Sequence, residues 1–332
     1  MAERLLSLKS GISVVVPVYN SEKMLEELVQ RLGSALDGLG LDYEIILVND
    51  GSRDQSWREI NRLCVRSADP GQVSKPHTPV RGINLMRNYG QHNALLCGVR
   101  AARFDRVVTM DDDLQHPPDE IPALLAKLDE GYDVVYGTPI HQQHSLWRKL
   151  ASYFTRLALQ SAMGVENARQ VSAFRAFRTQ IRTAFERYQS PFVILDVLLA
   201  WGTTRFTSLP VHHDPRQSGV SNYTFRMLLI HAINMVTGFT VLPLQLASLM
   251  GFGFAVFGIL VLFYVIGRYL IQGGSVPGFP FLASIVAIFS GVQLFALGII
   301  GEYLARMHFR IMEKPTYVIR ETAEEETDEP NE

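Results

Sequence analysis

Two long uncharged stretches in the C-terminal part of the chain constrain its architecture more than any other feature. Residues 241–271 contain one charged side chain, Arg268, and residues 279–300 contain none. About 20 apolar residues are enough for a helix to cross the hydrocarbon core of a bilayer. A helix in the core of a soluble domain seldom has this length without charges. We therefore predict two transmembrane helices, at residues 241–271 and 279–305.

Charged residues beside these stretches predict their orientation. The connection at residues 272–278 has no charge, whereas Arg226 precedes the first stretch and Arg306, Arg310 and Lys314 follow the second. Lys and Arg gather on the cytoplasmic side of membrane helices. The N-terminal residues lack the apolar core of a signal peptide. We therefore expect both termini to be cytoplasmic and only the connection to face outward.

Two further segments border the predicted membrane helices. Residues 223–240 mix apolar side chains with Arg226 and His231, which is typical of an amphipathic helix lying in the membrane interface. Residues 306–332 are predicted to form a cytoplasmic tail. Its segment 314–320 is strand-like and could reach another subunit, and its acidic end is predicted to be disordered.

Residues 1–222 alternate strand-like and helix-like patterns. Apolar, β-branched runs at residues 12–18, 43–48, 82–85 and 106–110 are separated by amphipathic segments. This order predicts an α/β domain with a mostly parallel sheet. Polar side chains directly follow three of the runs, and ligands of open α/β sheets bind at that edge. The polar groups are at residues 19–22, 49–50 and 111–113.

The third polar group is an acidic cluster, Asp111, Asp112 and Asp113, with Gln115 two residues later. Adjacent carboxylates repel one another, and a divalent cation with oxygen ligands compensates that charge. Alternation along an extended segment would turn Asp111, Asp113 and Gln115 toward a metal and Asp112 away from it. The alternative is a solvated turn before a helix that begins at residues 117–120.

Composition and missing motifs exclude several classes of function. The formal net charge is −2, so no global positive field indicates nucleic acid as a partner. Cys64 and Cys97 stand apart from any cluster of metal ligands and are predicted to be reduced core residues. The glycine-rich motifs of dinucleotide-binding and P-loop proteins are absent. A nucleotide could still bind with Asp50 hydrogen-bonded to its base or ribose.

Five motifs resemble those of the family-2 glycosyltransferases, which have a GT-A fold. They are VVVPVYN, VNDGS, LMRNYGQHNA, MDDDLQHPPDEIP and GIIGEYLAR. The chain is most similar to the polyprenyl-phosphate glycosyltransferases, such as dolichyl-phosphate mannose synthases, bactoprenol glucosyltransferases and undecaprenyl-phosphate formamido-arabinose transferases. The resemblance implies a bacterial inner-membrane enzyme that transfers a sugar, with inversion, from a nucleotide diphosphate, with UDP expected over GDP. The acceptor would be polyprenyl phosphate, the cofactor Mg²⁺ or Mn²⁺, and the assembly a homo-oligomer, with a tetramer expected.

The resemblance also implies roles for individual residues on the donor side. Arg216 would clamp the donor diphosphate, and Asp112 would lie beside the donor. Asp112 is also the candidate general base, although an anionic phosphate acceptor does not require one. The expected metal ligands are Asp111, Asp113 and Gln115. The expected nucleotide-sugar-binding residues are Pro17, Tyr19, Glu22, Asp50, Asp111, Asp112 and Arg216.

On the acceptor side, the resemblance points to Arg148, Arg169, Ser172 and Arg175 as phosphate-binding residues. Arg169 stands where relatives have an acid, so it either adds a phosphate contact or is an exposed arginine. Arg148 either holds the acceptor phosphate or attracts the membrane surface. Asn222 replaces the usual lysine of the loop that contains Arg216, which leaves its role open.

Two other functions are compatible with the sequence. A membrane-bound transferase could build a polysaccharide or use another lipid, although such synthases usually have more spans and a Q-x-x-R-W segment. A membrane protein that kept the fold without the activity would be a non-enzymatic binder. No pattern in the sequence identifies the sugar, because pocket contacts lie in variable loops.

Overall fold

The computed structural model describes residues 8–67, 79–139, 171–214, 242–272 and 278–323. The chain divides into two compact units. The first comprises Met1–Thr224 and Glu313–Glu332, and the second comprises Phe225–Met312. Each unit is described by itself, and the predicted interfacial segment 223–240 lies outside the described residues.

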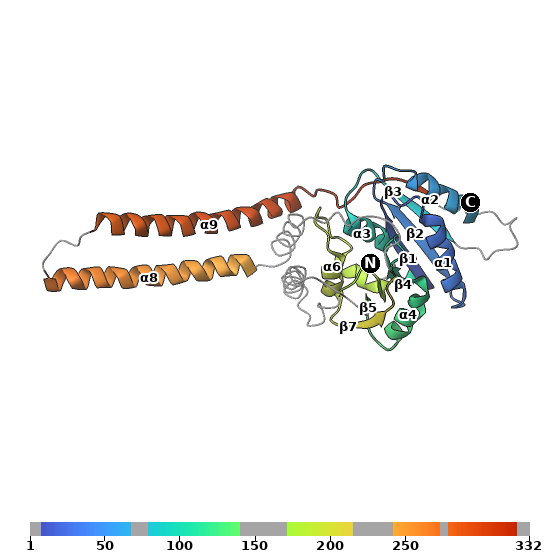
Figure 1. Cartoon of the computed structure of the whole chain (residues 1–332), viewed down its shortest axis with the longest axis horizontal. Helices are drawn as coiled ribbons and strands as arrows, with labels where there is room; N and C mark the ends of the chain where they lie inside the picture. Colours follow the sequence, from blue (N-terminus) through green and yellow to red (C-terminus); the bar gives the residue numbers. More distant parts are fainter. Residues whose placement is uncertain (1–7, 68–78, 140–170, 215–241, 273–277, 324–332) are drawn as a thin grey trace. The chain divides into compact units, whose positions relative to one another are not determined.

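The described strands of the first unit form an eight-stranded mixed sheet in the order β7-β5-β6-β4-β1-β2-β3-β8 (Figure 1). The strands are β1 Lys9–Val18, β2 Tyr43–Asn49, β3 Val80–Leu85, β4 Phe104–Thr109, β5 Val134–Pro139, β6 Arg175–Arg178, β7 Phe206–Val211 and β8 Ile319–Ala323. The first three contain the predicted runs 12–18, 43–48 and 82–85, and β4 covers the run 106–110 except for Met110, which confirms those four strands. Their neighbours at the β7 end include antiparallel pairs, which the sequence patterns did not specify.

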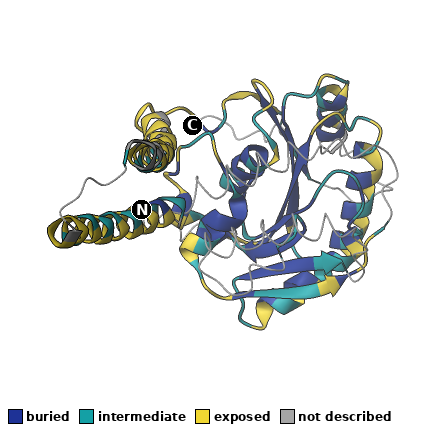
Figure 2. Ribbon diagram, turned by 60° about the vertical axis from the view of Figure 1, so that its left-hand side comes forward, coloured by how far each residue is buried: buried dark blue, intermediate teal, exposed yellow. Residues whose placement is uncertain are grey.

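The parallel centre of the sheet follows from its apolar sequence. β1 pairs in parallel with β2 and with β4, so Val14 lies opposite both Ile45 and Val108. All three side chains are fully buried. Strands covered on both faces are continuously apolar rather than alternating, and the central strands are drawn as buried along most of their length (Figure 2).

Helices cover both faces of the sheet (Figure 1). α1, α2 and α4 form contacts on one side, and α3 contacts α6 and η3 on the other. α3 approaches the sheet closely at Gly98, where an added Cβ would lie 2.3 Å from Cγ1 of Val15. The helices are α1 Leu25–Asp37, α2 Ser56–Ser67, α3 Gln91–Ala101, η1 Pro118–Glu120, α4 Ile121–Asp129, η3 Thr179–Phe185 and α6 Leu195–Gly202.

The strand after the apolar helices belongs to the same sheet. β8 pairs antiparallel with β3, with Glu321 opposite Asn84. The sequence suggested that residues 314–320 could reach another subunit. In the structure the last two of them, Ile319 and Arg320, belong to β8 and lie beside β3 of the same chain. Sequence patterns do not define such a partner, because 237 positions separate Asn84 from Glu321.

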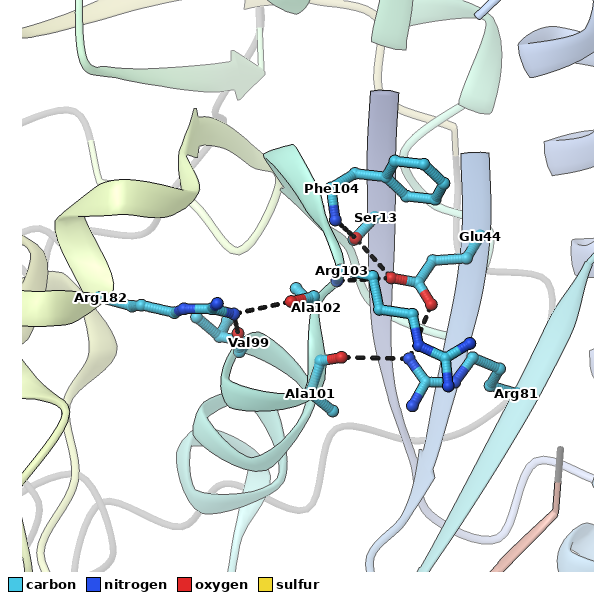
Figure 3. A network of polar contacts seen from close by, with 9 residues as sticks. All are labelled: Ser13, Glu44, Arg81, Val99, Ala101, Ala102, Arg103, Phe104 and Arg182. Atoms are coloured by element: carbon cyan, nitrogen blue, oxygen red, sulfur yellow. Dashed lines mark hydrogen bonds and ion pairs between the residues drawn. The ribbon is translucent and has the colours of Figure 1, made fainter. Parts of the chain in front are cut away.

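A buried polar network lies at the amino-terminal ends of the central strands (Figure 3). The carboxylate of Glu44 accepts hydrogen bonds from the Ser13 hydroxyl at 2.7 Å and the Arg103 amide at 2.8 Å. Nη1 of Arg81 donates to the same carboxylate at 2.7 Å. Glu44 is 3% exposed, and burying its charge requires these partners. The network therefore joins three strands at the edge opposite their carboxyl ends.

The second unit contains the helices α8 Leu242–Gln272 and α9 Phe279–Ile311. Both predicted apolar segments are therefore confirmed as helices. Within them, Pro243–Ile271 and Ile288–Ala305 are long and apolar enough to cross a membrane, and neither window is buried. The helices contact each other, with the Phe254 and Phe289 rings 5.8 Å apart. Their large apolar side chains are mostly exposed (Figure 2), which is expected where lipid replaces water.

Candidate active site

The candidate site lies at the carboxyl ends of the central parallel strands. β1 stands between β2 and β4. The chain passes from β1 to β2 and β3 on one side and then returns to β4 on the other side, so the strand order reverses at β1. Ligands of open α/β sheets bind at such a switch point. A cavity of about 230 Å³ opens there, and the residues that line it come from the end of β1, from the loops after β1, β2, β3 and β4, and from the start of α3. They are Pro17, Val18, Tyr19, Asp50, Asn88, Gly90, Gln91, Asp111, Asp112 and Asp113.

All three acids of the cluster line this cavity. The prediction that alternation separates Asp112 from its neighbours is wrong, because β4 ends at Thr109 and the following residues form turns. Leu114 has a left-handed φ of 56°, which ends any extended path. Gln115 is not among the lining residues, although its amide donates to Oδ1 of Asp113 at 3.2 Å.

Asp112 joins the acidic cluster to the loop after β1. Its Oδ2 accepts a hydrogen bond from the Tyr19 amide at 3.3 Å. Burial raises the pKa of the Asp112 carboxyl, hydrogen bonds from Ser21 and Tyr19 lower it, and the charge of Asp113 raises it. The crowded negative charge at this edge therefore favours a positively charged or hydrogen-bond-donating ligand.

Asp50 holds the loop after β3 in place. Its carboxylate accepts hydrogen bonds from the amides of Tyr89 at 2.7 Å and Gly90 at 2.8 Å. Burial raises the Asp50 pKa, while these two donors and the charge of Arg87 lower it. The sequence predicted a base or ribose contact for Asp50. In the structure this side chain lines the cavity and also shapes its wall.

The loops after β1 and β2 bind each other through polar side chains. Glu22 accepts a hydrogen bond from the Gln55 amide at 2.8 Å, and Oδ1 of Asn20 accepts one from the Arg53 amide at 2.8 Å. Glu22 was predicted to bind the nucleotide, but it does not line the cavity. Its observed partner indicates that it braces the two loops.

A histidine pair connects the acidic segment to the chain that leads to Arg216. The His116 ring stacks on Phe174 at 5.2 Å and meets the His213 ring edge-on at 4.8 Å. Burial and the nearby His213 lower the His116 pKa to about 4, against the charge of Asp113. The Asp214 amide donates to the Gln115 carbonyl at 2.8 Å. Residue 214 is therefore beside the acidic segment, two positions before Arg216 in the sequence.

Two of the residues predicted to bind the acceptor phosphate, Ser172 and Arg175, are among the described residues. Ser172 precedes β6, and its Oγ accepts a hydrogen bond from the Phe174 amide at 3.2 Å. Arg175 is 2% exposed and forms a buried ion pair with Asp196. Its Nε also donates to the Thr109 hydroxyl at 3.1 Å. Arg175 is therefore a core residue in this structure and is not presented to a phosphate. The other predicted acceptor residues, Arg148 and Arg169, lie outside the described residues, as does Arg216, the predicted clamp of the donor diphosphate.

The side chains of the cluster fit a hard divalent ion only in part. Among the described residues, no group of three His, Cys, Asp or Glu side chains is arranged to hold a metal by itself. Magnesium, however, is commonly bound by one or two carboxylates, with substrate phosphates and water supplying the other ligands. Asp111 and Asp113 in a cavity of this size provide that kind of partial site.

Sequence reasoning missed the role of the loop after β3. Nε2 of Gln91 donates to Oδ1 of Asp111, which places the first residue of α3 against the acidic cluster. Asn88 and Gly90 also line the cavity. The motif LMRNYGQHNA contains all three, yet it lacks charged clusters, so only the resemblance marked it.

The sheet and its position define an α/β protein with an acid-lined cavity at the switch point between β1 and β4. The chain belongs to glycosyl transferase family 2, whose family model matches residues 13–188. It is thus a glycosyltransferase with the GT-A fold.

Several known proteins are similar to this chain. An undecaprenyl-phosphate 4-deoxy-4-formamido-L-arabinose transferase from Shewanella sediminis is 37% identical over 93% of this chain and 92% of the relative. A transferase of the same name from an Enterobacter species is 36% identical, with the same coverage. The solved structure of a Mycobacterium tuberculosis glucosyl-3-phosphoglycerate synthase with Mn²⁺, UDP-glucose and phosphoglyceric acid is 20% identical. That comparison covers 71% of this chain and 81% of the other, with a TM-score of 0.48.

Proposed function

We propose that this enzyme transfers a sugar from a nucleoside diphosphate sugar, preferably a UDP-sugar, to the phosphate of a polyprenyl lipid. The reaction would invert the anomeric carbon at the cytoplasmic face of the bacterial inner membrane. The observation that carries the proposal is the acid-lined cavity at the switch point, where Asp111, Asp112 and Asp113 come together with Asp50. A donor with a diphosphate is a ligand whose charge such a site can hold only through a cation.

The chain has residues that could bind the nucleoside of the donor and residues that could bind its diphosphate. Pro17, Tyr19 and Asp50 line the cavity on the side of β1 and β2, which suits the nucleoside. Asp111 and Asp113, with Gln115 beside them, would hold Mg²⁺ or Mn²⁺, which would neutralise the diphosphate leaving group when bound. Arg216 would add a bidentate positive clamp on the same diphosphate.

The acceptor is inferred from the relatives and from the second unit. Two curated relatives that cover nearly the whole chain have undecaprenyl phosphate in their names. α8 and α9 expose apolar surfaces long enough to cross a bilayer. A polyprenyl phosphate keeps its head group at the interface and its tail in the hydrocarbon, so an enzyme anchored there meets it directly. Ser172, Arg148 and Arg169 remain the proposed phosphate-binding residues.

The reaction needs alignment more than proton transfer. The acceptor phosphate is already anionic at neutral pH, so the attacking oxygen needs no strong base. The enzyme would place that oxygen opposite the leaving diphosphate and stabilise the departing charge. Asp112, bound to the loop after β1 by the Tyr19 amide, would orient the donor sugar on the attacked side.

The test is a donor panel with the purified full chain in detergent. UDP- and GDP-sugars would be incubated with undecaprenyl phosphate and Mg²⁺ or Mn²⁺, and lipid-linked sugar would be followed by mass spectrometry. Asp113→Ala should abolish metal-dependent transfer. Asp119→Ala, an exposed acid on the same stretch, should keep it. Donor hydrolysis without transfer to the lipid, or full activity of Asp113→Ala, would contradict the proposal.

A further inference from the structure

The loop after β3 is a wall of the donor cavity. We term residues 86–90 the donor loop, because Asn88 and Gly90 line the cavity and Gln91 follows directly. Asp50 binds the loop from inside through the amides of Tyr89 and Gly90. The loop contains one glycine with a left-handed φ of 98°, at Gly90. A connection of this kind needs external contacts to stay in one conformation.

A segment that follows the membrane helices in sequence supplies contacts at the start of the donor loop. We term residues 316–323 the C-terminal strap. The carbonyl of Val318 accepts a hydrogen bond from the Met86 amide at 2.9 Å. Nη2 of Arg320 donates to the Met86 carbonyl at 3.1 Å. Both backbone groups of the first loop residue are therefore bound by the strap.

The strap also holds the helix that begins after the donor loop. Nδ2 of Asn93 donates to the Thr316 carbonyl at 2.8 Å. Both residues are 4% exposed, so water cannot easily replace this bond. Asn93 lies in the first turn of α3, two residues after Gln91, which contacts Asp111. One segment thus binds both the start of the donor loop and the helix that follows the loop.

A third contact runs from the strap toward Asp50. Nδ2 of Asn84 donates to Oε1 of Glu321 at 2.8 Å, and Oδ1 of Asn84 accepts from Nδ2 of Asn49 at 2.8 Å. Glu321 accepts the bond that fixes the orientation of the Asn84 amide. Asn49 immediately precedes Asp50 and is 2% exposed. The side-chain amides of Asn84 and Asn49 therefore link the strap to Asp50, which binds the donor loop.

From these contacts we propose that the C-terminal strap positions the donor loop, with Asn93 and Glu321 as positioning residues for nucleotide binding. The inference rests on the proposed nucleoside diphosphate donor. Only residues 312–315 separate the end of α9 from the strap. The donor site is therefore completed by chain that lies beyond the apolar helices in sequence. A loop that is ordered only part of the time binds its ligand more weakly by that fraction.

The test compares Asn93→Asp with the wild type as full-length protein in detergent. The substitution keeps the size of the side chain and removes the donor to Thr316, together with the longer bond of 3.3 Å from the same Nδ2 to the Pro191 carbonyl. Gln30→Glu is the matched control, because it makes the same amide-to-acid change at an exposed position of α1. UDP with Mg²⁺ is the probe for titration calorimetry, and hydrogen–deuterium exchange reports on residues 86–91. Glu321→Ala, a change at an exposed site, is a second variant that does not threaten the core.

The expected result is a three- to ten-fold weaker affinity for UDP in Asn93→Asp, on the order of one hydrogen bond, with faster exchange in the donor loop. Turnover at saturating donor should stay within about two-fold, because the reacting groups are untouched. Glu321→Ala should shift affinity and exchange in the same direction. Affinity and exchange equal to those of Gln30→Glu in both variants would overturn the proposal. If the wild type binds no nucleotide, the proposed donor fails, while the exchange rates alone still decide whether the strap orders the loop.

Discussion

Gly51 is the residue where a single methyl group should disturb the donor site most directly. It has a φ of 64°, and a Cβ there would lie 2.5 Å from the Arg87 carbonyl carbon and the Asn88 amide nitrogen. Both are backbone atoms of the donor loop, so the clash cannot be relieved by rotating a side chain. Gly51→Ala should lower stability by about 1–3 kcal/mol and weaken UDP binding, as measured by thermal unfolding and calorimetry.

Gly40 provides the control for this prediction. Its φ is 62°, yet an added Cβ would meet nothing within 4 Å. Gly40→Ala therefore carries only the conformational cost of the left-handed region, about 1 kcal/mol. UDP affinity should not change in Gly40→Ala. Equal effects of the two substitutions on binding would show that the contact with the donor loop is unimportant.

The buried pair of Arg175 and Asp196 should determine stability rather than acceptor binding. Tyr136 also donates to the Asp196 carboxylate at 2.9 Å. Asp196→Asn leaves the buried guanidinium without a counter-charge and should cost about 3–5 kcal/mol of unfolding free energy. Adding Arg175→Met removes the uncompensated charge and should recover part of that loss. A stable double variant that has lost transfer to the lipid would instead favour a phosphate contact by Arg175.

Both cysteines should be chemically inert in the folded enzyme. Cys64 and Cys97 are 2% and 1% exposed, and both are reduced, which confirms the predicted core role. Burial raises the pKa of the Cys97 thiol to about 12, against hydrogen bonding from Tyr317 and the charge of Arg100. Because the thiolate is the reactive form, neither thiol should react with a disulfide reagent at pH 8. Both thiols should react after the protein is denatured. A rapidly reacting thiol in the native enzyme would contradict this placement.

At the scale of elements, the positions of the central strands could be predicted from the sequence, but their order in the sheet and the contacts between loops could not. Continuous β-branched runs defined the central strands, because burial on both faces leaves a strong apolar pattern. The alternation argument failed beyond β4, since it assumed an extended chain where Leu114 turns it. The bond of Asp50 to the Tyr89 and Gly90 amides involves backbone groups. Because every residue except proline has a backbone amide, the sequence does not show which amides will bind a given side chain.

Mutations at the amino-terminal ends and at the carboxyl ends of the central strands should have different effects. Glu44 binds β1 and β3 at the edge opposite the cavity, and its side chain is 4% exposed. Glu44→Ala leaves the partly buried Arg81 without its counter-charge, so it should cost about 3 kcal/mol. UDP affinity at temperatures where the variant is folded should be unchanged. The measurements are thermal unfolding and calorimetry.

Glu26→Ala is the control for Glu44. Glu26 pairs with Arg62 at 3.1 Å on the surface, with 54% of its side chain exposed. An exposed pair contributes at most about 1 kcal/mol, so Glu26→Ala should change the unfolding free energy very little. A Glu44 variant as stable as the Glu26 variant would show that the network in Figure 3 is not a main support of the sheet.

At the scale of the whole molecule, two kinds of surface have to serve one reaction. The first unit offers a polar, acid-lined cavity, and the second offers exposed apolar helices. The proposed reaction joins a water-soluble donor to a lipid acceptor, which would require these two environments. Hydropathy alone predicted the helices, because a bilayer imposes a length that few soluble helices match. The strap that returns from α9 to β3 could not be predicted, since strand pairing over such a separation depends on tertiary contacts.

The last prediction concerns how the helices lie in the membrane. If the basic residues that follow the apolar part of α9, Arg306, Arg310 and Lys314, lie on the cytoplasmic side, the connection at residues 272–278 faces outward. In bacterial spheroplasts, a membrane-impermeant maleimide should label Ser275→Cys and leave Ser34→Cys, an exposed position on α1, unlabelled. Permeabilisation should expose both sites, while the buried native cysteines stay silent throughout. Labelling of residue 34 in intact spheroplasts would place the catalytic unit outside, away from cytoplasmic nucleotide sugars, and would contradict the proposed reaction at the inner face.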